Sequence, residues 1–153
     1  MFKILLYQPL IPYNTGNIIR LCSNVGATLH LIHPLGFSLE DKLLKRAGLD
    51  YIDLSIIREY SSLEEYLDEN DLSRIFATTS KAKKVYSEIS YKVGDTLLFG
   101  PEDLGVPKDI YKKIRNSIRI PMQPNNRSLN LSNAVAIVIY QAWHQVNFAG
   151  AIA

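Results

Sequence analysis

The chain changes character abruptly across IPMQPNNRSLNLSNAVAIVIY, residues 120–140. Amide and hydroxyl side chains crowd residues 125–133, and the following segment, Ala134 to Tyr140, is apolar almost all the way round. Capping a helix needs one such polar side chain, for which Ser132 and Asn130 are the candidates, so the surplus indicates a binding loop. A helix with no polar face must be covered on more than one side. We expect a sheet on one side and a second copy of the chain on the other, the alternative being a central helix inside one domain.

Short apolar runs alternate with helical patterns along the rest of the chain. That alternation favours an α/β domain with a largely parallel sheet that helices cover on both faces. The expected strands are Phe2 to Tyr7, Thr28 to Ile32, Ser55 to Tyr60, Arg74 to Thr79, Thr96 to Phe99 and Ser117 to Ile120. The first expected helix has its N-cap at Asn14 or Thr15, runs to Val25 and is closed by Gly26. The other expected helices are Ser38 to Arg46, Ser62 to Glu69, Lys108 to Ile114 and Leu131 to Val146. Pro107 suits the first position of the helix that continues to Ile114.

Length and composition limit the possibilities. A chain of 153 residues that is 47% hydrophobic predicts one domain over residues 1–153, with no room for a second. Its single cysteine, Cys22, has no partner for an intrachain disulfide and is expected in the core. No run approaches the roughly 18 apolar residues of a membrane span and no signal-peptide pattern opens the chain, so we expect a cytoplasmic protein. The net charge of +2 means that an RNA-binding face must come from how the charges are arranged.

Three loops contain residues that packing does not require. They are Asn14 to Arg20 (NTGNIIR), Phe99 to Pro107 (FGPEDLGVP) and Ile120 to Asn133, and each follows an expected strand. In open α/β sheets, ligands bind at the carboxyl ends of strands, where these loops begin. Gly100 permits close approach of a ligand. Neither G-x-G-x-x-G nor a P-loop occurs, which disfavours a nicotinamide-dependent enzyme and an ATP site.

Taken together, the three loops resemble the motifs of the SPOUT class of RNA methyltransferases, whose α/β fold contains a deep trefoil knot. NTGNIIR is similar to the first motif, FGPEDLGVP to the second, and IPM followed by NNRSLNLSNA to the third. The similarity is close to the minimal tRNA (cytidine(34)-2′-O)-methyltransferases and runs from Leu6 to the region of Trp143, including RAGLDY at 46–51. It implies a Rossmann-like α/β/α sandwich whose knot occupies about residues 96–146.

The resemblance also implies S-adenosylmethionine (AdoMet) as cofactor, bound in the knot by the C-terminal loops. An apolar slot with a few backbone donors and acceptors suits its adenine. Thr78 stands where an aliphatic residue is expected, and a backbone contact would tolerate that change. No metal is implied, and the three histidines lack metal-ligand spacing and companion cysteines. Carried onto matching positions, the cofactor contacts fall at Thr78, Gly100, Ile120, Ser128, Leu129 and Asn133.

The family assigns activation of the ribose 2′-hydroxyl to the residue that matches Arg20. A guanidinium stays protonated in proteins, so we expect Arg20 to orient the nucleotide and to stabilise negative charge that develops on oxygen. Asn17 and Tyr140 are the other expected substrate-side residues, with an interface aromatic as the alternative for Tyr140. Glu102 is expected to fix the geometry of its loop. A homodimer packed through the C-terminal helices would set the AdoMet loops of one copy beside Asn17–Arg20 of the other.

The implied substrate is the ribose at wobble position 34, C or modified U, of tRNA, with leucine isoacceptors expected and the anticodon stem-loop as the bound element. Candidate phosphate contacts are Lys42, Lys45, Arg46, Lys81, Lys83 and Lys84. The same motifs would serve methylation of another RNA ribose, in ribosomal RNA or elsewhere in tRNA. A catalytically silent RNA-binding module is the alternative outside the enzyme class, which the joint presence of Arg20, Asn17, Gly100 and Asn133 disfavours.

Overall fold

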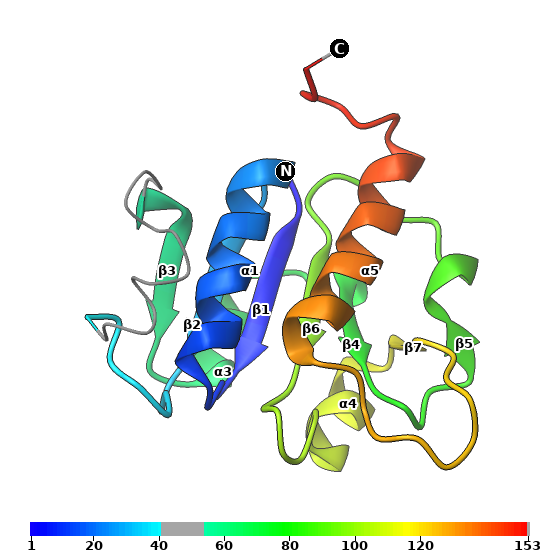
Figure 1. Cartoon of the computed structure of the whole chain (residues 1–153), viewed down its shortest axis with the longest axis horizontal. Helices are drawn as coiled ribbons and strands as arrows, with labels where there is room; N and C mark the ends of the chain where they lie inside the picture. Colours follow the sequence, from blue (N-terminus) through cyan, green and yellow to red (C-terminus); the bar gives the residue numbers. More distant parts are fainter. Residues whose placement is uncertain (41–53, 153) are drawn as a thin grey trace.

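A computed structural model of the chain describes residues 1–40 and 54–152 (Figure 1). The strands are β1 (Lys3–Tyr7), β2 (Thr28–Ile32), β3 (Ile57–Tyr60), β4 (Ile75–Thr78), β5 (Lys84–Val85), β6 (Thr96–Phe99) and β7 (Ser117–Arg119). The α-helices are α1 (Pro12–Val25), α3 (Leu63–Asp68), α4 (Lys108–Ile114) and α5 (Leu131–Gln145). Short 3₁₀ helices are η2 (Leu54–Ile56), η3 (Leu72–Arg74) and η4 (Tyr86–Glu88).

The strands form one parallel sheet in the order β3-β2-β1-β6-β4-β7-β5. Because every pair is parallel, the carboxyl ends of all strands meet at one edge. In Figure 1, α1 and α5 lie in front of the sheet and α3 and α4 lie behind it. The predicted α/β class with a parallel sheet covered on both faces is therefore confirmed, and the threading of a trefoil knot stays a prediction.

The strands alternate their side chains between two cores. In β1, Ile4 and Leu6 belong to the core under α1 and α5, whereas Leu5 belongs to the core under α3 and α4. From α5, Val135 and Val138 are fully buried in the first core. Each such burial stabilises the fold by roughly 1.5–3 kcal/mol. Side chains alternate between the two faces of a strand, whereas in a helix they return to the same face about every 3.6 residues. These two spacings determine which residues of each strand and helix lie in a core.

The prediction that Asn14 or Thr15 caps the first helix is wrong. α1 begins earlier, at Pro12, with Ile11 in the N-cap position and no capping side chain of its own. Proline fits the first turn because it has no N–H to leave unsatisfied. Asn14 and Thr15 are therefore buried inside the first turns. The closing residue is as predicted, since Gly26 ends α1 with φ 68°.

The other boundaries differ from the predictions in small ways. The two-residue edge strand β5 was not predicted, and residues 54–56 form η2 ahead of β3. Pro107 occupies the N-cap of α4 instead of its first position. Asn130, the second of the two cap candidates, caps α5, and Ser132 lies in the first turn. Most of the helix predicted from Ser38 to Arg46 lies outside the described residues, as does RAGLDY.

A polar aromatic cluster is buried between β2, β3 and α3. His30 is 4% exposed, and its two ring nitrogens lie 3.0 Å from Thr28 Oγ1 and 3.1 Å from Tyr60 Oη. The Tyr66 ring packs edge-on against both His30 and Tyr60. Burial, followed by the positive charges of Lys3 and Arg58, lowers the pKa of His30 to about 4. The imidazole is therefore neutral in the folded chain at neutral pH.

This cluster makes folding sensitive to acid. The unfolded histidine takes up a proton near pH 6.5 and the folded one only near pH 4, so the free energy of unfolding falls as the pH drops through that window, by up to about 3 kcal/mol. Urea unfolding at pH 7, 5.5 and 4.5 measures this loss. In His30→Gln the loss should shrink, whereas His144→Gln, at an exposed position, should keep it. If the free energy of unfolding of His30→Gln falls with pH as much as that of the parent, His30 is not the source of the acid sensitivity.

Candidate functional site

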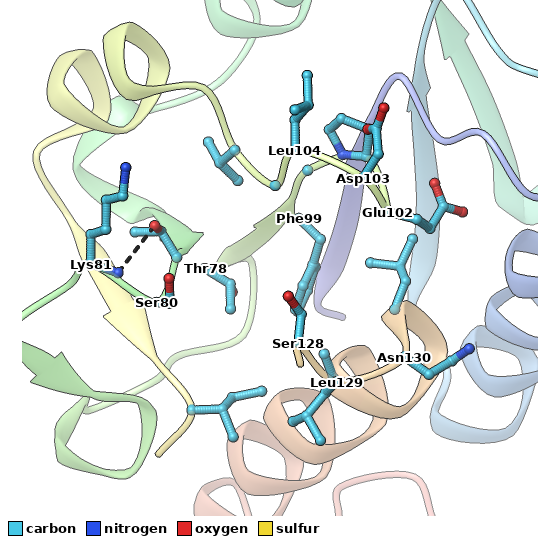
Figure 2. A pocket seen from close by; sticks show the side chains of 18 of the residues that line it. Thr78, Ser80, Lys81, Phe99, Glu102, Asp103, Leu104, Ser128, Leu129 and Asn130 are labelled. Atoms are coloured by element: carbon cyan, nitrogen blue, oxygen red, sulfur yellow. Dashed lines mark hydrogen bonds between the residues drawn. The ribbon is translucent and has the colours of Figure 1, made fainter. Parts of the chain in front are cut away.

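A cavity of about 720 Å³ opens at the carboxyl edge of the sheet. Its walls come from the loops after β4, β6 and β7, together with the first turns of α1 and α5. Figure 2 shows Thr78, Phe99, Ser128 and Leu129 gathered around this hollow from three separate segments. The second and third loops singled out in the sequence therefore meet at one place, and the first contributes Asn14.

Five of the six predicted cofactor residues line the cavity. They are Thr78, Gly100, Ile120, Ser128 and Leu129. The sixth, Asn133, is exposed in the first turn of α5 and is not among the lining residues; its backbone N–H donates to Asn130 Oδ1 (3.4 Å). The hydroxyl oxygen of Thr78 is buried without a hydrogen-bond partner.

Gly100 is required by the close return of its own loop. A Cβ atom built on Gly100 would overlap the backbone of Gly105 and Val106. The return is closed by a hydrogen bond from the Gly105 N–H to the Pro101 carbonyl (2.9 Å). Gly100 itself therefore contributes only backbone to the cavity wall.

A chain of side-chain hydrogen bonds ties the three loops together. The Glu102 carboxylate accepts from the backbone N–H groups of Leu10 (2.7 Å) and Ile11 (3.0 Å) and from Asn14 Nδ2 (3.3 Å). Asn14 Oδ1 in turn accepts from Asn130 Nδ2 (2.9 Å). Asn130 Oδ1 caps α5 by accepting from the N–H of Ser132. The prediction that Glu102 fixes loop geometry is confirmed, because its carboxylate holds the two residues just before α1.

The predicted substrate-side residues lie outside the cavity of their own chain. Arg20 is exposed and Asn17 is half-buried on α1, and Tyr140 is 44% exposed on α5. None of the three is among the residues that line the cavity. Within one copy of the chain, the structure does not bring them together with the predicted cofactor residues.

The outer face of α5 presents aromatic side chains. The Tyr140 and Trp143 rings meet edge-on with centroids 5.6 Å apart, and Trp143 meets Phe148 in the same way at 5.2 Å. Phe148 is 39% exposed, and Ile137 lies on the side of the helix opposite its buried residues. An apolar surface of this kind on a helix indicates an interaction site.

Sequence reasoning missed several cavity residues. Lys108 and Tyr111 of α4 line the cavity, and so does Asn14. The one sequence feature that could have predicted the two α4 residues as cavity residues is their position directly after the second motif, FGPEDLGVP. Cys22, by contrast, is buried as predicted, and burial raises the pKa of its thiol to about 12. That thiol is an inert part of the core.

Comparison with known proteins places this geometry in a family. The family model described as SpoU rRNA Methylase matches residues 1–140. The chain belongs to the SpoU rRNA methylase family. Family membership agrees with the resemblance drawn from the three loops.

Relatives match over their full lengths. A protein of Methylovorus glucosotrophus (strain SIP3-4) named tRNA (cytidine(34)-2′-O)-methyltransferase is 51% identical over 99% of this chain and 100% of its own. One of the same name from Escherichia coli (strain K12) is 47% identical over 99% and 98%. A solved structure described as structural insights into the 2-OH methylation of C/U34 on tRNA superposes with a TM-score of 0.90, at 40% identity over 96% of this chain and 97% of that one. A putative RNA methyltransferase from Bacillus anthracis gives 0.89, at 44% identity over 98% and 97%.

No group of three or more His, Cys, Asp or Glu side chains in residues 1–40 and 54–152 is placed to hold a metal ion. In the same part of the chain, no helix is long and apolar enough to cross a membrane.

Proposed function

We propose that the chain is an AdoMet-dependent methyltransferase that modifies the ribose 2′-hydroxyl of wobble nucleotide 34, C or modified U, in tRNA, with leucine isoacceptors as the expected substrates. The observation that carries this proposal is the meeting of the second and third motif loops, with Asn14 of the first, around one cavity. We place the activity in the cytoplasm, in a single domain over residues 1–153 with its knot at about 96–146.

The cavity fits the cofactor. Its volume lies within the roughly 300–1,000 Å³ of small-molecule sites. Ile120 and Leu129 offer apolar surface for adenine, and the bare backbone at Gly100 allows close approach. Ser128 adds a hydroxyl group for the polar parts of the molecule. When bound, AdoMet supplies an electrophilic methyl group.

Arg20 and Asn17 act on the nucleotide. The guanidinium of Arg20 donates hydrogen bonds and stabilises negative charge on the 2′-oxygen or a neighbouring phosphate, and Asn17 lies one turn before it on α1. Tyr140 is proposed as the third substrate-side residue.

Incubation with methyl-labelled AdoMet and total tRNA, followed by nuclease mapping, tests the proposal. Label at the 2′-oxygen of nucleotide 34 is the expected result. Label on another tRNA ribose or on ribosomal RNA would reassign the substrate. AdoMet binding without label on any RNA would favour the silent RNA-binding module and overturn the enzyme assignment.

The hydrogen-bond chain from Glu102 supports cofactor binding by holding the loops in register. In Glu102→Ala, the N–H groups of Leu10 and Ile11 lose a charged acceptor, which costs about 1.5–3 kcal/mol for each such bond that water does not replace. We expect lower stability in urea and weaker AdoMet binding by calorimetry. Asp68→Ala, which removes an exposed carboxylate on α3 away from the cavity, is the control. Equal AdoMet affinities in the two variants would contradict this role.

We further propose a homodimer through α5. The apolar outer face of α5 supports this arrangement, and a second copy would bring Arg20 to a cavity that its own chain does not offer it. Ile137→Lys places a charge on that face and is expected to shift sedimentation from dimer to monomer at micromolar concentration. Glu64→Lys, on α3 at the other face of the sheet, is the control. A monomeric parent chain, or a dimeric Ile137→Lys, would contradict the proposal.

A further inference from the structure

Helix α4 carries an unusual concentration of positive charge. Residues 108–115 hold four basic side chains and one acidic side chain, whereas the whole chain has a net charge of only +2. The ion pairs found in the described part of the chain, His33–Glu59 and Arg74–Asp95, lie on other elements. The positive charge of α4 therefore faces solvent without a salt bridge among the described residues.

The helix separates its charges by side. Ile110 and Ile114 are buried against the sheet. Lys108 and Lys112 lie four residues apart and therefore share one side of the helix, and Arg115 follows as the residue that ends it; we call these three residues the α4 stripe. Asp109 and Lys113 lie on the other side of the helix, four residues apart, where they compensate each other.

The one acid of α4 lies away from the α4 stripe. Asp109, like Glu64 of α3, contributes after burial to raising the pKa of Tyr7 at the end of β1. Asp109 is therefore within electrostatic reach of Tyr7, on a side of α4 that does not carry the stripe. Within residues 108–115, the stripe has no acid on its own side of the helix.

The α4 stripe is continuous with the cavity. Lys108 lines the cavity, as does Tyr111, which lies between the stripe and the buried side of the helix. Lys81 and Arg127 line the cavity from two other loops, and Figure 2 shows Lys81 at its edge. Two acids, Glu102 and Asp103, also lie in the cavity wall, and Glu102 already accepts hydrogen bonds from backbone N–H groups.

These cations do not match the cofactor. AdoMet carries a sulfonium, an ammonium and one carboxylate, so its net charge at neutral pH is positive. A row of cations beginning at the cavity and running about 10 Å along a helix suits a polyanion instead. Tyr111 is half-buried, lines the cavity and has no ring contact with another aromatic side chain of the described residues, so it offers aromatic surface of the kind on which exposed nucleic-acid bases stack.

We propose that the α4 stripe binds the phosphate backbone of the substrate RNA next to the cofactor cavity. The proposal rests on the proposed function for the identity of the RNA and extends it to a surface on the opposite face of the sheet from α1 and α5. Phosphate contacts from both faces let one chain of low net charge hold tRNA.

The test compares two double variants that remove the same charge. Lys112→Gln/Arg115→Gln alters the two stripe residues that do not line the cavity, and Arg58→Gln/Lys92→Gln removes two exposed cations, one on the edge strand β3 and one next to the small cavity at the amino edge of the sheet. Binding of unfractionated tRNA is measured from 50 to 200 mM KCl, and AdoMet binding is measured by calorimetry. The stripe variant should bind tRNA about tenfold more weakly, with a salt slope lower by about 1.5, and should keep its AdoMet affinity.

Arg115→Gly tests whether losing one positive charge weakens tRNA binding without destabilising the fold. Arg115 has φ 65°, a conformation that favours glycine, so this substitution relieves the backbone while removing a charge. Unchanged or higher thermal stability with weaker tRNA binding is expected.

The outcomes distinguish this proposal from the function on which it rests. Unchanged tRNA affinity in both stripe variants, or an equal loss in the Arg58/Lys92 control, would overturn the inference about α4. Loss of binding to phosphatidylglycerol vesicles with tRNA affinity intact would assign the stripe to lipid and overturn it too. A parent protein that binds no tRNA would refute the proposed function first, whereas tRNA binding that depends on the stripe but yields no methylation would refute only the enzymatic part.

Discussion

Arg20→Ala is expected to reduce methyl transfer to tRNA by at least about 10²- to 10³-fold, the effect of removing one preorganised donor from a developing oxyanion. AdoMet affinity should stay at the parent value. Arg20 lies on α1 outside the cavity, so its removal leaves every cavity wall intact. Stability should also stay unchanged, because the side chain is exposed. Single-turnover methylation and calorimetry with AdoMet measure the two properties separately.

Two further variants define what the guanidinium does. Arg20→Lys keeps the positive charge without the forked donor geometry, and partial activity would show that charge carries part of the effect. Arg58→Ala removes an exposed arginine from β3 and should leave turnover unchanged. Methylation by Arg20→Ala at the parent rate would refute the role of Arg20.

Mixing inactive subunits tests whether Arg20 serves the cavity of another copy. Leu129→Arg places a charge in the cavity wall and should abolish AdoMet binding, while its Arg20 is intact. When Arg20→Ala and Leu129→Arg are mixed and exchange subunits at random, half the dimers are mixed and each has one complete site, so about a quarter of the parent activity should return. If the mixture stays inactive although mixed dimers form, Arg20 does not act across the interface.

Local signals predicted the elements well where the whole cause lay nearby. The strand at Thr96–Phe99 and the helix at Lys108–Ile114 have the predicted bounds. The strand is an apolar run that ends at Gly-Pro, and the helix is an amphipathic segment that follows a proline, so the local sequence alone determines where each begins and ends. Strand β5 escaped prediction since it is two residues long and is defined by its pairing with β7. Its partner is more than thirty residues further along the chain.

The sequence predicted most of the residues that line the site, but it did not predict how the loops contact one another. The motif loops indicated a shared edge, and five of six cofactor residues line the cavity there. The start of α1 differs from the prediction because the two residues just before it, Leu10 and Ile11, are held by Glu102, about ninety residues later. Asn133 belongs to the motif by sequence, but the helical turn after Asn130 carries it away from the cavity. Contacts at such separations follow from the folded sheet order and have no local sequence signal.

Gly100→Ala is expected to abolish AdoMet binding in the micromolar range and to destabilise the fold by about 1–3 kcal/mol. The added methyl group would overlap the Gly105 and Val106 backbone, which cannot move aside as a flexible side chain would. The loop must open to accommodate it, and opening displaces both the cavity wall and Glu102, which holds the start of α1. Calorimetry with AdoMet and thermal unfolding measure the two effects.

Gly105→Ala is the matched control in the same loop. Its Cβ would meet nothing within 4 Å, but its φ of +66° disfavours a side chain, so it carries backbone strain of about 1–2 kcal/mol without the overlap. If close packing at Gly100 shapes the cavity, Gly105→Ala loses stability yet binds AdoMet more tightly than Gly100→Ala. Should Gly100→Ala fail to fold, Leu129→Arg addresses the same wall from an exposed loop and should lose AdoMet binding with little change in stability. Parent affinity in both Gly100→Ala and Leu129→Arg would mean that the cofactor binds elsewhere, because no ligand in this cavity could avoid both changes.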